Sequence, residues 1–104
     1  MDNFKMTFEN FKSSLDKKNP PENLNQLLLA LWYDAKGDWE KSHKLVSDIN
    51  SKEASLIHAY LHRKEGDLGN AEYWYRRAAT DCKNISLKEE WDFLVKNLCS
   101  ATYG

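Results

Sequence analysis

A pattern that occurs twice, 29 residues apart, constrains the fold of this chain most strongly. Each copy has an alanine seven residues before a Gly-Asp pair, a small residue five after the glycine and a bulky residue nine after it. Self-similarity at a period of about 20 to 50 residues is typical of stacked helical units. Glycine suits the left-handed end of one helix, and aspartate suits the N-cap of the next. The repeat therefore predicts two helix-turn-helix hairpins. Its residues are Ala30, Gly37, Asp38, Ser42 and Val46 in the first copy, and Ala59, Gly66, Asp67, Ala71 and Tyr75 in the second.

Apolar residues at helical spacing extend the pattern to both sides of the repeat. An amino-terminal stripe ends before Asn19-Pro20-Pro21, and a capping box at Ser86–Glu89 precedes a carboxyl-terminal stripe. No segment alternates with period two for long enough to predict a strand. We therefore expect an all-α compact bundle of about six helices, forming one domain over 1–104. Its parts are an amino-terminal helix at 4–17, hairpin one at 22–49, hairpin two at 52–80 and a carboxyl-terminal helix at 87–100.

Charge and cysteine content narrow the functional classes. The formal net charge is −1, from 15 basic and 16 acidic side chains spread along the chain, so no global field attracts nucleic acid or an anionic membrane. Cys82 and Cys99 lie outside any Cys-x-x-Cys pattern, as expected of reduced thiols. The amino terminus has no continuous apolar run of the kind found in signal peptides. We predict a cytoplasmic protein whose stability needs no cofactor.

The strings LALWYDAKGDWEKSHKLV and HAYLHRKEGDLGNAEYWYRRA carry a resemblance to known proteins. Residues about 24–80 resemble the tetratricopeptide-repeat family of helical hairpins, and the same strings are similar to a family of small bacterial proteins without an assigned activity. The 29-residue spacing is shorter than the usual 34 or so, and no proline closes either repeat. These departures favour a compact bundle over regular superhelical stacking.

The tetratricopeptide resemblance implies that the first helix of each hairpin lines a concave groove. In hairpin two this places Tyr60, Arg63 and Lys64 in the groove, and in hairpin one it places several leucines there. Such leucines need a cover, because soluble monomers rarely expose a large apolar patch. We expect that cover to be the amino-terminal helix or a second subunit. The apolar stripe of that helix comprises Phe4, Phe8, Phe11 and Leu15.

The leading functional hypothesis is a protein-interaction module without catalytic activity. The only local grouping of basic and aromatic side chains lies in hairpin two, and we assign Tyr60, Arg63, Lys64 and Arg77 to a surface that binds a protein or peptide, or a second copy of the chain. A competing interpretation is that these cations form a solvated face that compensates the helix dipole. The chain has no phosphate-binding loop, nucleophile elbow or dinucleotide fingerprint, so no catalytic residue is assigned.

The alternative hypothesis is a metal-binding or small-ligand protein, which could be an enzyme. His58 and His62 are four residues apart on one predicted helix face, a spacing that lets two imidazoles share a metal ion. His43 is available as a third ligand. The competing interpretation is structural, because His58 and His62 match the packing positions Leu29 and Tyr33 of the first hairpin.

Overall fold

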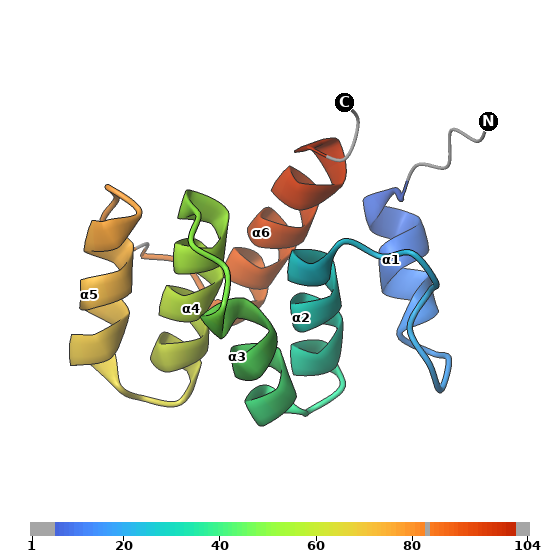
Figure 1. Ribbon diagram of the computed structural model, residues 1–104, viewed down its shortest axis with the longest axis horizontal. Coiled ribbons are helices and arrows are strands. Elements are labelled where there is room, and N and C mark those ends of the chain that lie inside the picture. Colours follow the sequence, from blue (N-terminus) through green and yellow to red (C-terminus); the bar gives the residue numbers. More distant parts are fainter. Residues whose placement is uncertain (1–5, 83, 102–104) are drawn as a thin grey trace.

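The computed structural model describes residues 6–82 and 84–101. This part of the chain contains six helices and no strand, which confirms the all-α prediction (Figure 1). The helices are α1 (Phe8–Ser14), α2 (Gln26–Ala35), α3 (Trp39–Ser47), α4 (Lys52–Lys64), α5 (Leu68–Arg77) and α6 (Leu87–Ala101).

The two Gly-Asp pairs form the two turns that the repeat predicts. Gly37 and Gly66 adopt φ of 90° and 89°, a region that favours glycine because it has no Cβ. Asp38 then caps α3 by accepting from Lys41 N, and Asp67 caps α5 by accepting from Asn70 N. Each glycine therefore ends one helix and the next aspartate begins another.

Several helix ends differ from the prediction: α1 ends at Ser14 rather than 17 and α3 at Ser47 rather than 49, and two further ends differ for local reasons. The helix expected from residue 22 begins at Gln26, because Asn25 rather than the proline pair provides its cap and accepts from Leu27 N at 2.8 Å. The helix expected to reach residue 80 ends at Arg77, and Ala79 beyond it has φ of 58°. At the amino-terminal helix, α1 begins at Phe8 after the Thr7 cap, and the expected start at residue 4 lies outside the described residues.

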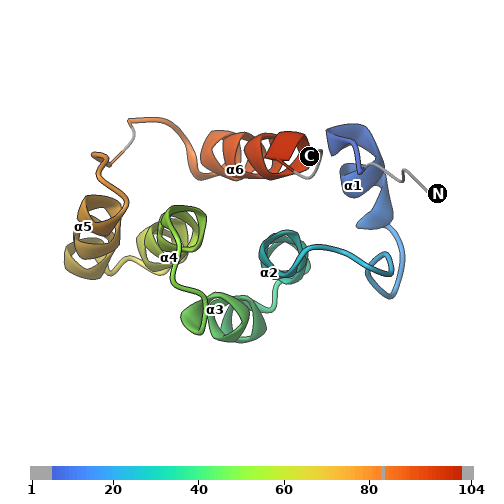
Figure 2. The same ribbon diagram turned by 45° about the horizontal axis from the view of Figure 1, so that its top comes forward.

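Helices α2 to α5 form an arc, and α6 closes its open side (Figure 2). Helix α6 packs against both α2 and α4, and its Trp91 Nε1 donates to Leu31 O at 3.1 Å. The groove expected from the repeat is therefore filled from within the same chain. The core combines buried residues of these helices: Leu27, Leu28, Leu31, Ile57, Leu61, Trp91, Leu94, Val95 and Leu98.

The amino-terminal helix, one of the two expected covers of these leucines, contributes the buried Phe11 to the core, but α6 is the helix that spans both hairpins. Helix α1 lies beside α6: the ring centroids of Phe11 and Trp91 are 5.8 Å apart, and Lys96 Nζ is 4.8 Å from the centroid of Phe8. Its Ser14 Oγ accepts from Trp32 Nε1 at 3.0 Å, which fastens α1 to α2. The longer α6 is the helix that reaches both hairpins.

In the described part of the chain, no helix has the length and apolarity that a bilayer crossing requires.

Candidate metal centre

All three histidines of the chain meet at the junction between the hairpins. His43 projects from α3, while His58 and His62 lie one turn apart on α4. Packing holds these helices together, and Trp39 Nε1 of α3 donates to Leu61 O of α4 at 2.8 Å beside the histidines. The cluster therefore joins hairpin one to hairpin two.

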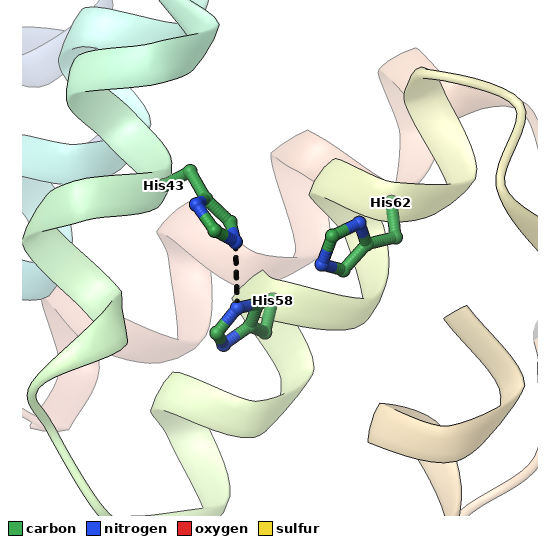
Figure 3. A group of neighbouring side chains, drawn as sticks. All are labelled: His43, His58 and His62. Atoms are coloured by element: carbon green, nitrogen blue, oxygen red, sulfur yellow. Dashed lines mark hydrogen bonds between the residues drawn. The ribbon is translucent and has the colours of Figure 1, made fainter. Parts of the chain in front are cut away.

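The three rings converge closely enough to share one ion. Each histidine offers a ligand nitrogen, and these nitrogens lie within 4.8 Å of one another. The Nε2 atoms of His43 and His58 are 2.9 Å apart, and His62 faces the same space (Figure 3). His58 and His62 are 6% and 7% exposed, whereas His43 is half-buried. A hydrogen bond between two Nε2 atoms requires one of them to carry the proton and the other to accept it.

The other nitrogen of His62 has its own partner. Glu65 Oε2 lies 2.8 Å from His62 Nδ1, one turn further along the chain. A carboxylate only accepts hydrogen bonds, so it favours the proton on Nδ1 and leaves the lone pair on Nε2. Carboxylates orient metal-binding histidines in this way in many proteins. The arrangement therefore prepares Nε2 of His62 as a ligand.

Two tryptophans form the walls of the cluster. The indole of Trp39 stacks on His43 with centroids 4.8 Å apart, and the indole of Trp74 stacks on His58 with centroids 3.9 Å apart. The ring planes are nearly parallel, with interplanar angles of 9° and 6°. Flat contacts of this kind remove water from the imidazole faces while leaving the nitrogen edges available. The tryptophans thus restrict the rings to orientations in which their nitrogens converge.

Burial favours the neutral form of the histidines. It lowers the pKa of His58 to about 4, with further lowering by His43, His62 and Arg77. Burial and then His62 also lower the pKa of His43, which Glu65 partly opposes. His58 and His43 are therefore neutral at pH 7, the form in which imidazole binds a metal.

The structure brings together the histidines that sequence spacing singled out. They are buried or half-buried and hydrogen-bonded, as the structural interpretation expects, and they also converge as a ligand set would. Sequence reasoning missed the roles of Glu65, Trp39 and Trp74. The His62–Glu65 separation of three residues is a detectable signal for a helical pair, whereas the tryptophan stacking depends on helix placement.

The structure corrects the assignment of Tyr60 to an exposed partner surface, and it gives Arg63 and Lys64 acidic partners within the chain. Tyr60 is 3% exposed, and its hydroxyl donates to Asp34 Oδ2 at 2.8 Å. Burial, followed by the charge of Asp34, raises the pKa of this phenol, so it is a neutral donor. Lys64 Nζ donates to the other oxygen of Asp34 at 2.9 Å. Tyr60 and Lys64 therefore serve to hold a buried carboxylate of α2.

Arg63 pairs in a similar way with a buried carboxylate of α6. Its guanidinium donates to Glu90 Oε1 at 2.6 Å and to Ile85 O. Glu90 is 2% exposed and also accepts from the Tyr75 hydroxyl at 2.5 Å. Of the four assigned residues, Lys64 and Arg77 are exposed, and the Cζ of Arg77 lies 5.1 Å from the centroid of Trp74. Sequence reasoning did not identify Asp34 and Glu90 as their partners, because nothing local marks a carboxylate as buried.

Comparison of the chain with protein-family models, with curated proteins and with solved structures finds no match.

Proposed function

We propose that this protein binds one divalent transition-metal ion, such as Zn²⁺, through Nε2 of His43, His58 and His62. The observation that carries the proposal is the convergence of all three histidines of the chain, with ligand nitrogens within 4.8 Å of one another. Imidazole is a favoured ligand of zinc, copper and nickel. The ion would take the place of the proton now shared by His43 and His58.

The distances require only small side-chain adjustments. Zn–N bonds of about 2.0 to 2.1 Å in a tetrahedral site place ligand nitrogens about 3.3 Å apart. The separation of 2.9 Å between His43 and His58 lies slightly below this value, and the 4.8 Å bound on the whole cluster lies above it. Rotation about the side-chain torsions supplies differences of this size. The neutral state of His58 and His43 at pH 7 removes proton competition.

The test is calorimetric titration of untagged, metal-free protein with ZnCl₂ at pH 7. We expect one ion per chain and a melting temperature that rises with free zinc, because the folded state alone offers the assembled site. Quenching of Trp39 and Trp74 fluorescence by Co²⁺ or Ni²⁺ gives a second readout, since both rings stack on ligand histidines.

Matched variants separate ligands from supporting residues. His43→Ala removes the most accessible histidine and should nearly abolish binding. Glu65→Gln removes an orienting carboxylate and should weaken binding by about 10- to 100-fold. Glu53→Gln, an exposed change on the same helix, is the control and should bind normally. Absence of binding to Zn²⁺, Co²⁺ and Ni²⁺, or undiminished binding by His43→Ala, would refute the proposal.

A second candidate function is protein binding by two tetratricopeptide-like hairpins in the cytoplasm. The observation that favours it is the outer face of α5, which ends the arc in Figure 1 and exposes Leu68 by 62% and Tyr73 by 45%. Arg77 lies over the Tyr73 ring on this helix. Concentration-dependent mass and pulldown with Tyr73→Ala plus Arg77→Ala test it. Unchanged recovery of partner or dimer by this double variant contradicts an α5 interface.

A further inference from the structure

The candidate metal centre offers three protein ligands, one fewer than four-coordinate zinc requires. Within the described part of the chain, no other His, Cys, Asp or Glu supplies a ligand atom to the group formed by the three histidines. Glu65 is nearby but contacts Nδ1 of His62, the nitrogen opposite to the one that faces the cluster. Asp67, which forms a separate group with Glu65 and His62, is occupied as the α5 cap.

One ligand of the centre lies at the surface of α3. His43 is half-buried and lines a surface hollow together with Trp39, Lys44 and Ser47. His58 and His62, by contrast, are almost completely covered. We infer that the fourth ligand would approach the centre from the side of His43. Three histidines with an open fourth position are typical of catalytic zinc, whereas structural zinc has four protein ligands.

Building on the proposed metal site, we propose that the fourth ligand is an exchangeable water molecule and that the zinc-loaded protein hydrolyses small esters. Zinc lowers the pKa of bound water from about 15.7 to about 7, so hydroxide forms near neutral pH and its proton passes to solvent. The hydroxide oxygen forms a bond to the ester carbonyl carbon. The bond from that carbon to the alcohol oxygen would then break and the alcohol would leave with a proton from solvent. The acid product would lose its proton to solvent and leave as carboxylate, and a water molecule would take the fourth position.

The apolar walls of the site support this chemistry. Trp39 and Trp74 cover the faces of two ligand histidines and place apolar rings beside the ligand nitrogens. Electrostatic interactions are stronger where water is excluded, so the charge of the ion acts more strongly on a bound water molecule.

The experiment replaces Zn²⁺ with Co²⁺ and follows the visible absorption of the loaded protein from pH 6.5 to 9, with and without sodium azide. We expect one spectral change near pH 7 and a further change on adding azide, because a monodentate anion displaces water. A cobalt spectrum that responds to neither pH nor azide would show a fourth protein ligand and overturn the inference. A protein that develops no cobalt spectrum would instead overturn the metal site itself.

Hydrolysis of p-nitrophenyl acetate by the zinc-loaded protein is the second readout. We expect a rate at least about tenfold above that of His43→Ala in the same zinc buffer, rising with the ionisation seen for cobalt. Glu65→Gln, once saturated with cobalt, should keep its response to azide, since Glu65 orients His62 and does not bind the ion. Equal rates for the zinc-loaded protein and His43→Ala would refute the hydrolytic activity.

Discussion

Replacing Arg63 with methionine removes a guanidinium but keeps most of the aliphatic stem, so it isolates one charge. In the native protein this guanidinium pairs with Glu90, a carboxylate of α6 that is 2% exposed. After Arg63→Met, the Glu90 side chain keeps its hydrogen bond from the Tyr75 hydroxyl, and Ile85 O loses the Arg63 donor. A buried charge that loses its partner costs about 3 to 5 kcal/mol.

We expect the lower end of this range, about 3 kcal/mol, because the Arg63 side chain is 19% exposed and solvent already screens part of the pair. Domains of this size are stable by about 5 to 15 kcal/mol, so the variant should still fold. Urea unfolding followed by helical circular dichroism measures the loss. With a slope of about 2 kcal/mol per molar, the midpoint should fall by about 1.5 M while the slope stays the same.

Two further variants test whether the unpaired charge of Glu90 causes the loss of stability. Combining Arg63→Met with Glu90→Gln removes the unpaired charge and keeps an acceptor for Tyr75, so it should recover most of the lost stability. Lys88→Met breaks an exposed pair with Asp92 and should cost at most about 0.5 kcal/mol. A cost below about 1 kcal/mol for Arg63→Met, or a double variant as unstable as the single one, would refute the reasoning. The first result would also restore Arg63 as a candidate surface residue.

The remaining predictions concern single side chains. In metal-free protein, a His58 pKa near 4 means that protonation favours the unfolded state: stability is complete above pH 6.5 and is lost as pH falls toward 4. From pH 7 to 5, the protonation of His58 should lower the free energy of unfolding by about 2 kcal/mol, and this loss should be missing in His58→Leu. Urea midpoints measured at each pH test this, and equal losses in both proteins would contradict a lowered His58 pKa. Ser42 Oγ is buried without a hydrogen-bond partner among the described residues, and the matching position of the second hairpin is Ala71. Ser42→Ala should therefore raise the free energy of unfolding by about 1 kcal/mol, and a loss of stability would indicate a partner for the hydroxyl. Gly37→Ala should lower the melting temperature, at a cost of about 1 kcal/mol, because its φ is 90°. Gly69→Ala, in open space on α5, should raise it by a similar free energy, and shifts of the same sign would contradict this contrast.

Much of the local fold was predictable because its signals act over a few residues. Gly37 and Gly66 lie at the turns, and their aspartates cap the following helices, as the repeat predicts. The start of α2 was predicted too early, directly after the proline pair. A proline indicates only where a helix can begin, whereas the capping side chain of Asn25 determines where α2 begins. Local chemistry of this kind can be read along the chain.

The candidate site was predictable only in part. The spacing of His58 and His62 places both on one face of a helix, whatever packs beside it. The position of His43 beside His58 and His62 depends on the angle and register between α3 and α4. The same dependence explains why Tyr60 was misassigned, because the buried Asp34 that accepts its hydrogen bond belongs to a different hairpin.

By itself, the sequence determined the helical class, the two Gly-Asp turns and the residues that could act as ligands, because steric and capping preferences are properties of short segments. Tertiary structure decided that α6 rather than α1 closes the groove, that Arg63 neutralises Glu90 inside the protein, and that three histidines meet at one point. Each of these outcomes joins residues distant in the chain. Helical periodicity indicates which face is buried but not which helix buries it, and that choice is made by packing among all the helices at once.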